Sequence, residues 1–166
     1  MLNLLVAADI SNLYFCAKEQ FKNRVDYTYL LKKIVRRDNM IRALAYGTET
    51  NGDTGFKNHL ANSGWDVRFR EAKVFKDGQR KANQDLEMAC DVIRHMHDVH
   101  KIALCTGDGD FSALIRFLKE RGKIVCVYGI NISHELQIAD LCVELNERFL
   151  ECHNPRPGVV CQQPQR

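Results

Sequence analysis

The stretch Thr106-Gly107-Asp108-Gly109-Asp110-Phe111 decides the expected fold of this chain. An apolar run at residues 102–105 leads into it, and an amphipathic run at residues 111–121 leaves it. This order predicts a buried strand, a glycine-containing turn with two carboxylates, and a helix. Two interpretations of the aspartates are open at this point. Either both aspartates form half of a divalent-cation site at the end of a strand, or Asp110 caps the helix and Asp108 lies in a turn.

Apolar and amphipathic segments alternate along the rest of the chain. Strands are expected at residues 2–8, 41–46, 65–72, 102–105, 124–128 and 141–145. Helices are expected at residues 13–21, 27–37, 55–62, 83–97 and 111–121, with a loop at 47–54 and a turn or short hairpin at 74–80. This alternation predicts an α/β three-layer sandwich with a mainly parallel central sheet. We expect one domain at residues 1–150 and a disordered tail at residues 151–166.

The expected helix at residues 83–97 presents an apolar stripe that we assign to the core. Its members are Leu86, Ala89, Cys90, Ile93 and Met96. Asp91 lies six residues beyond Asp85, so the two cannot share one coordination shell directly. Arg94, three residues further on, is the expected partner of Asp91.

Composition excludes several classes of protein. The chain has 166 residues, 45% of them hydrophobic, which suits one globular domain with a full core. No apolar run reaches the ~20 residues of a membrane span, and the start lacks the basic region of a signal peptide. The seven cysteines are odd in number and form no CxxC pair, which indicates the cytoplasm and argues against disulfides or a thiolate zinc site. A formal charge of +3 is too small to establish nucleic-acid binding.

Four aspartates are expected at one edge of the sheet. In open parallel sheets the ligand site lies outside the carboxyl ends of the strands. Asp9 follows the first strand, Asp108 and Asp110 follow the fourth main strand, and Asp85 begins the helix that enters that strand. Clustered carboxylates raise one another's pKa, so they predict a neutralising cation. Oxygen ligands without matched His or Cys favour Mg²⁺ or Mn²⁺ over zinc.

Polar residues flank this edge of the sheet, where Asp9, Asp85, Asp108 and Asp110 are expected; we call this edge the rim. Asn12 offers a neutral amide that can orient a water or a phosphate. Arg80 and Lys81 end a basic segment that abuts the rim, and they predict phosphate contacts and salt-dependent binding. Ser133 is expected as a helix N-cap or as a hydroxyl at the rim.

Other clusters have simpler interpretations. The basic group is interpreted as a solvated helix face, and it consists of Lys32, Lys33, Arg36 and Arg37. A zinc site at His95, His97 and His100 is disfavoured, because residues 95 and 97 point ~200° apart on a helix. Exposed histidines near a helix C-terminus are the favoured interpretation. Three aromatic residues near strand ends are expected to pack, with base stacking as the alternative: Tyr14, Phe15 and Tyr46.

The order of these motifs resembles the NYN domain of the LabA type, which belongs to the PIN-like nucleases. The resemblance spans residues 2 to about 146 and is carried by Asp9-x-x-Asn12, Lys81-x-x-x-Asp85 with Asp91, residues 106–111, Gly122-Lys123-x-Val125, Ser133-x-Glu135-Leu136 and Ala139-Asp140. It implies a Rossmann-like PIN fold and metal-dependent cleavage of RNA. By the same resemblance, the metal ligands are Asp9, Asp85, Asp108 and Asp110, with Asn12 beside them. Ile10 follows Asp9 where many members carry glycine, and this bulkier turn is expected to narrow the pocket.

We therefore expect a cytoplasmic, Mg²⁺- or Mn²⁺-dependent ribonuclease, endonucleolytic rather than exonucleolytic. RNA is the expected partner, no membrane is expected, and a homodimer is an open alternative. The expected catalytic residues are Asp9, Asn12, Asp85, Asp108 and Asp110, and the expected substrate-binding residues are Arg80, Lys81 and Ser133. Two alternatives remain: a non-catalytic regulatory module of the same fold that binds RNA, nucleotide or protein, and a phosphatase-like enzyme. The second is disfavoured because Asp9-x-x-Asn12 lacks an Asp-x-Asp pair.

Overall fold

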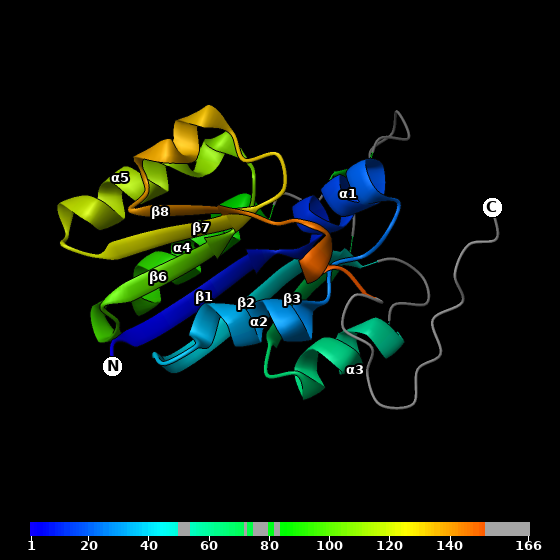
Figure 1. The fold of residues 1–166 in the computed structure, drawn as a ribbon, viewed down its shortest axis with the longest axis horizontal. Helices are drawn as coiled ribbons and strands as arrows, with labels where there is room; N and C mark the ends of the chain where they lie inside the picture. The colour runs from blue at the N-terminus through cyan, green and yellow to red at the C-terminus, as the bar shows by residue number, and fades with distance from the viewer. Residues whose placement is uncertain (50–53, 72, 75–79, 82–83, 152–166) are drawn as a thin grey trace.

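The computed structural model describes residues 1–49, 54–71, 73–74, 80–81 and 84–151, with the backbone alone at residues 73–74 and 80–81. Figure 1 shows a twisted central sheet with helices on both of its faces. The expected tail lies, from residue 152 onward, outside the described residues.

The elements follow the expected alternation of strands and helices. The strands are β1 (Asn3–Asp9), β2 (Asn39–Glu49), β3 (Asp66–Glu71), β4 (Lys73–Val74), β5 (Arg80–Lys81), β6 (Lys101–Cys105), β7 (Ile124–Gly129) and β8 (Leu141–Glu144). The α-helices are α1 (Ile10–Phe21), α2 (Tyr27–Val35), α3 (Thr54–Asn62), α4 (Asp85–His95) and α5 (Ser112–Glu120). Short 3-10 helices are η1 (Met96–Asp98), η2 (Gly109–Phe111), η3 (His134–Ile138) and η4 (Glu147–Phe149).

The main sheet has the strand order β3-β2-β1-β6-β7-β8, and every neighbouring pair is parallel. The chain builds β1 to β3 outward on one side, then crosses to β6 and builds outward on the other. The order therefore reverses between β1 and β6, where open α/β sheets bind their ligands. The expected parallel α/β sandwich is confirmed. β4 and β5 form a separate antiparallel pair, as the expected hairpin requires.

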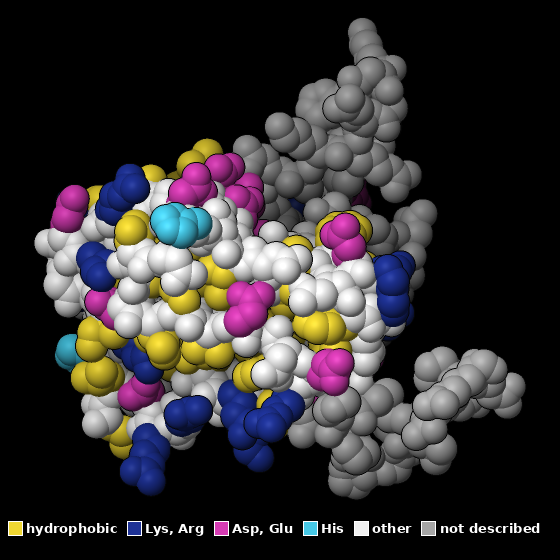
Figure 2. Space-filling model, turned by 45° about the horizontal axis from the view of Figure 1, so that its top comes forward, with side chains coloured by type: hydrophobic (Ala, Val, Ile, Leu, Met, Phe, Trp, Pro, Cys, Tyr) yellow, Lys and Arg dark blue, Asp and Glu magenta, His cyan; other side chains and the backbone are white. Residues whose placement is uncertain are grey.

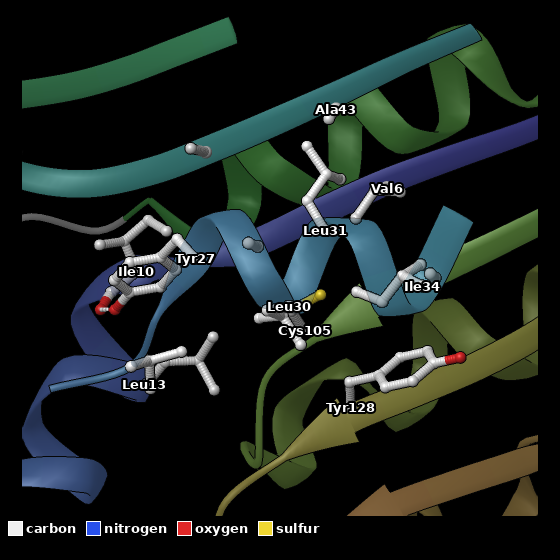
Figure 3. Packing of buried hydrophobic residues seen from close by; sticks show 14 of the residues in the cluster. Val6, Ile10, Leu13, Tyr27, Leu30, Leu31, Ile34, Ala43, Cys105 and Tyr128 are labelled. Atoms are coloured by element: carbon white, nitrogen blue, oxygen red, sulfur yellow. Dashed lines mark hydrogen bonds between the residues drawn. The ribbon is translucent and has the colours of Figure 1, made fainter. Parts of the chain in front are cut away.

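The two faces of the sheet carry two hydrophobic cores. Alternate residues of β1 point to opposite faces, so Leu4 and Val6 pack under α1 and α2, while Leu5 packs against α4 and α5. Figure 3 shows the first core, where Leu30 and Ile34 of α2 lie over the sheet. Buried side chains on both faces explain why β1 is an unbroken apolar run.

Helix α4 buries a different face from the one that the sequence suggested. Met88, Val92 and the polar Asp91 are buried, whereas Leu86 is 67% exposed and Ile93 is 37% exposed. Cys90, also assigned to the core, is exposed. Within the expected stripe, Met96 is buried and Ala89 is partly buried against the core, whereas the assignment of Leu86, Cys90 and Ile93 to the core was wrong. The physical reason is that Asp91 points inward to polar partners on β2 and β3, which turns the helix about its axis.

Strand β2 is longer than expected, because residues 47–49 were assigned to a loop and instead continue the strand. They pair with β3 in the register Gly47↔Phe69, Thr48↔Arg70 and Glu49↔Glu71. A Cβ atom on Gly47 would lie 2.6 Å from the Phe69 ring. The glycine is therefore a packing requirement within a strand, not a loop signal. The remaining residues of the expected loop, 50–53, lie outside the described part.

The described cysteines and helices bear on two further expectations. The five described cysteines are free thiols, and Cys105 and Cys126 are buried in the core. Within the described ranges, no helix combines the length and the apolar character that crossing a bilayer requires.

Candidate functional site

The first turn of α1 joins the ends of three strands. Asp9 ends β1 and caps α1, and its carboxylate accepts a hydrogen bond from the Asn12 backbone N–H at 2.9 Å. Ser11 Oγ accepts from the Thr48 N–H of β2 at 3.1 Å. Asn12 Oδ1 accepts from the Gly107 N–H, just after β6, at 3.0 Å. Polar side chains at the start of α1 thus fix the carboxyl ends of β2, β1 and β6 against one another.

Ile10 does not narrow this edge of the sheet. Its side chain is buried in the core beside Leu13 and Tyr27, as Figure 3 shows. The Tyr27 hydroxyl donates to the Ile10 carbonyl oxygen at 3.4 Å. The expectation of a narrowed pocket is therefore wrong, because the helix turns the side chain toward α2.

The loop after β6 is held by its own side chains. Thr106 is buried, and its Oγ1 accepts from the Asp108 N–H at 3.1 Å. The Asp108 carboxylate accepts from the Asp110 N–H at 3.0 Å, so Asp108 is the cap of η2. Asp110 itself lies in the first turn of η2 and is exposed. The cap interpretation was therefore assigned to the wrong aspartate.

This loop packs closely against the segment that follows β7. The Gly107 carbonyl oxygen accepts from the Ser133 N–H at 3.0 Å. The Ser133 hydroxyl donates to Glu135 Oε2 at 3.0 Å and makes no cap hydrogen bond to η3. Ser133 therefore occupies the N-cap position of η3, as expected, but its side chain does not make the capping hydrogen bond. Its hydroxyl lies 2.9 Å from the position of a Cβ on Gly109, which places it at the rim.

Gly107→Ala is expected to destabilise the protein by about 1–3 kcal/mol, because the added methyl group overpacks the loop. Its Cβ would lie 2.6 Å from the Ile130 carbonyl oxygen, which is backbone and cannot move aside cheaply. Urea unfolding measures this change. Gly109→Ala is the matched control, because its Cβ meets the end of the flexible Glu135 side chain. Equal stability losses in the two variants would contradict this account of the loop.

The rim carboxylates act on one another electrostatically. Burial raises the pKa of Asp9 from 3.8 to about 6, and the charges of Asp85 and Asp108 add to the rise. Burial also raises the pKa of Asp85, and Asp108 and Asp110 contribute to that rise. Asp85 therefore lies within electrostatic range of Asp9, Asp108 and Asp110 at this edge of the sheet. Such a cluster favours binding of a cation or a proton.

The donor set at this rim suits a hard divalent cation, since it consists of carboxylate oxygens and the Asn12 amide. These carboxylates repel one another, and a bound cation would reduce that repulsion. In the described part of the chain, no three His, Cys, Asp or Glu side chains are grouped closely enough to hold an ion as they stand. The residues fit a cation in chemistry and in charge, and they would have to close around it.

The comparisons with known proteins agree with this architecture. The family model described as the NYN domain matches residues 3–151. The chain belongs to the NYN domain family. Its fold is accordingly of the PIN-like nuclease type, the class to which NYN domains belong. PIN-like NYN nucleases typically use divalent metals.

Two relatives of this NYN domain extend the comparison. The chain is 32% identical to the low amplitude and bright protein LabA of Synechococcus elongatus, and the match covers 63% of each chain. It also resembles the crystal structure of VPA0982, a protein of unknown function from Vibrio parahaemolyticus, with 28% identity and a TM-score of 0.84. That likeness covers 90% of this chain and 96% of the other.

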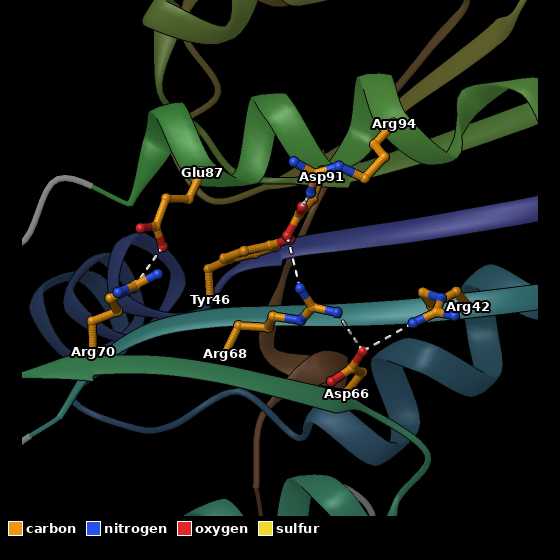
Figure 4. Close-up of polar contacts among 8 residues, drawn as sticks. All are labelled: Arg42, Tyr46, Asp66, Arg68, Arg70, Glu87, Asp91 and Arg94. Carbon is orange, nitrogen blue, oxygen red and sulfur yellow. Dashed lines mark hydrogen bonds and ion pairs between the residues drawn. The ribbon is translucent and has the colours of Figure 1, made fainter.

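Beside the rim of this NYN domain, a polar network anchors α4 to the sheet (Figure 4). Asp91 is 6% exposed and accepts from the Tyr46 hydroxyl at 2.8 Å and from Arg68 at 2.9 Å. Arg94 also donates to Asp91, which confirms the expected pair. Arg68 in turn donates to Asp66 at 2.9 Å. Because Asp85 begins the same helix, this network fixes the side of the rim that carries Asp85.

Sequence reasoning missed two polar residues near the rim. Tyr46 was expected to pack, which its 1% exposure confirms, but the sequence did not indicate that its hydroxyl donates to Asp91. Its register partner Arg68 also reaches Asp91 on the face that α4 covers, and this pairing becomes visible only in the structure. Gln84 is also buried and donates to the Gly47 carbonyl oxygen, which fastens the start of α4 to β2. No signal in the sequence identified Gln84.

The remaining expected residues have varied outcomes. The backbones of Arg80 and Lys81 form β5, and their side chains lie outside the described part. Lys32, Lys33, Arg36 and Arg37 are exposed at the end of α2, next to the start of β2 and opposite the rim. His97 and His100 are exposed, as expected.

Figure 2 shows one face of the molecule. Acidic side chains gather near a histidine on one part of this face, and lysine and arginine side chains gather along another edge of it.

Proposed function

We propose that this NYN domain is a metal-dependent ribonuclease that hydrolyses RNA internally, at the rim formed by β1, β6 and α4. The convergence of Asp9, Asp85 and Asp108 at the reversal of the strand order carries this proposal. Membership of a family with a nuclease-type fold supports it. The substrate is RNA, and the ion is Mg²⁺ or Mn²⁺, as hard oxygen ligands favour.

Each rim residue has a role in this proposal. Asp9, Asp85, Asp108 and Asp110 hold the ion. A divalent ion bound there supplies positive charge that activates water for attack on a phosphodiester. Asn12 has its Oδ1 engaged by the Gly107 N–H, so its Nδ2 hydrogens are left to orient the water or a phosphate oxygen. Arg80 and Lys81 hold the phosphate backbone, which makes binding salt-dependent. Ser133 adds a hydroxyl at the same rim.

A cleavage assay with single-stranded RNA and Mn²⁺ tests the proposal. Wild type is expected to cut, and Asp85→Asn and Asp108→Asn are expected to lose roughly 100-fold or more of the rate, because each removes a charge from the ion site. Asp98→Asn is the matched control, since exposed Asp98 precedes β6 at the opposite end of the sheet. Equal activity in all four proteins would overturn the site assignment.

The alternative is a non-catalytic module that binds RNA, nucleotide or protein with the same fold. The absence of a closed group of metal ligands among the described side chains favours it. Intact RNA after incubation of wild type with Mn²⁺, together with measurable RNA binding, would establish this alternative. Turnover of a generic phosphomonoester would instead indicate a phosphatase.

A further inference from the structure

Helix α1 carries an exposed aromatic side chain next to the rim. Phe15 is 66% exposed, and the other described Phe, Tyr and Trp side chains are buried or half-buried. Tyr14 supports it edge-on, with ring centroids 5.5 Å apart and planes at 77°. The contact with Tyr14 leaves a large apolar ring presented to solvent. Burying such a ring against a ligand is favourable.

The position of Phe15 on α1 directs the ring toward the rim. Asn12 and Ser11 lie three and four residues before it, so Phe15 is within ~60° of both around the helix axis. Those two side chains bind the ends of β6 and β2. A helical side chain leans over the turn that precedes its own Cα. The ring therefore overhangs the turn that bears Asn12, away from the core face of Leu13 and Ala17.

A positive charge lies beside the same aromatic pair. Lys18 Nζ is 5.6 Å from the centroid of the Tyr14 ring. Among the described residues Lys18 has no ion-pair partner, whereas Lys57, Lys101 and Lys119 each pair with a carboxylate. Lys18 is thus available to an external anion. A stacking ring with a free cation one turn away matches a nucleotide, which has an aromatic base and a phosphate.

We propose that Phe15 is a stacking platform for an unpaired base of single-stranded RNA whose backbone crosses the acidic rim, with Lys18 at an adjoining phosphate. This inference rests on the proposed function for the nature of the ligand. A base inside a duplex is stacked on both faces by its neighbours, so the platform is available only to an unpaired base. The arrangement makes the rim selective for single-stranded over double-stranded RNA.

A binding assay without metal tests the platform independently of cleavage. The probe is a single-stranded RNA oligonucleotide with 2-aminopurine, titrated into wild type, Phe15→Ala, Phe15→Leu and Phe15→Trp in EDTA. Stacking on a ring quenches the 2-aminopurine fluorescence. We expect quenching with wild type and Phe15→Trp, and a roughly 5- to 100-fold loss of affinity with Phe15→Ala. Phe15→Leu keeps an apolar side chain without a π face, and is expected to lose the quenching.

Two further variants complete the experiment. Ile41→Ala removes another exposed apolar side chain, 47% exposed near the start of β2, and is expected to bind as wild type does. Lys18→Ala is expected to weaken binding and to reduce the dependence of log affinity on log salt by about 0.7, the value for one phosphate contact on a single strand. The same oligonucleotide in a duplex, where neighbouring bases already stack on the 2-aminopurine, is expected to show no further change in fluorescence when the protein is added.

The outcomes separate the platform from the nuclease. Equal binding and quenching by wild type and Phe15→Ala would overturn the platform even if wild type cuts RNA. Loss of binding in Phe15→Ala with no cleavage by wild type would support the platform and overturn the nuclease. Unchanged RNA binding, together with a shift in oligomeric state of Phe15→Ala on gel filtration, would overturn the platform and assign Phe15 to a protein interface.

Discussion

Asp9→Asn is expected to abolish RNA cleavage and to stabilise the fold at neutral pH. The substitution removes a charge that the proposed ion site needs, and we expect a loss of roughly 100-fold or more in rate. It also removes a buried charge that the folded protein holds at a cost. An Asn oxygen can still accept the capping hydrogen bond from the Asn12 N–H. The two effects therefore have opposite signs.

The pH dependence follows from the pKa of Asp9, which rises from 3.8 to about 6 on folding. Above about pH 6 the carboxylate is ionised in both the folded and the unfolded chain, and the raised pKa corresponds to a cost of at most about 3 kcal/mol. As the pH falls through this range, the folded state takes up a proton first and the cost disappears. The stability advantage of Asp9→Asn should be largest above pH 7 and vanish near pH 4.

Urea unfolding of wild type and Asp9→Asn from pH 4 to pH 8, in EDTA, measures this difference. Asp26→Asn is the control for the cap, because Asp26 caps α2 in the same way, with its carboxylate 2.9 Å from the Tyr29 nitrogen. Adding Mn²⁺ is expected to stabilise wild type and to reduce the advantage of the variant. A variant less stable than wild type at pH 7.5 would contradict the account of a buried, repelled carboxylate.

Asp91→Ala is expected to lower the free energy of unfolding by about 3 kcal/mol or more. In the described part of the chain, every buried side-chain nitrogen and oxygen has a hydrogen-bond partner. The substitution would leave the Tyr46 hydroxyl buried without its partner. Arg68 would keep its ion pair with Asp66, so losing its hydrogen bond to Asp91 should cost less free energy. The burial of the orphaned hydroxyl therefore dominates the effect.

A double-mutant cycle isolates this contribution. Tyr46→Phe alone is expected to cost about 0.5–1.5 kcal/mol, the usual value of one hydrogen bond. Adding Tyr46→Phe to Asp91→Ala should cost less than this or restore some stability, because no orphaned hydroxyl remains. Arg94→Ala is the surface control, since Arg94 is 67% exposed and its pair with Asp91 should contribute under about 1 kcal/mol. Fully additive losses would show that Asp91 and Tyr46 do not depend on each other.

The sheet could be predicted because its strands are buried on both faces. An unbroken apolar run such as residues 4–8 has no polar side that could face solvent, and helices between such runs require parallel strands. The rim followed from the same logic, since the carboxyl ends of neighbouring parallel strands share one edge. Asp9 and Asp108, nearly a hundred residues apart, were placed together by topology alone.

The face of α4 could not be predicted, because the decisive partners come from other elements. A stripe of Leu86, Cys90 and Ile93 follows helical spacing as well as the buried stripe of Met88 and Val92 does. Asp91 selects between them, and an aspartate is ordinarily counted as exposed. Its partners on β2 and β3, Tyr46 and Arg68, make inward burial of that carboxylate favourable, and their distance in sequence hides them.

The hydrogen bond from the Gly107 N–H to Asn12 has a consequence for biosynthesis. It unites the first helix with a loop that leaves the ribosome much later, and the rim exists only after β6 has added to β1. Domains commonly fold during synthesis as their segments emerge. The rim therefore forms only after the segments that carry Asp9 and Asp108 have both emerged, and a nascent chain that holds β1 and α1 alone lacks the site on which the proposed activity depends.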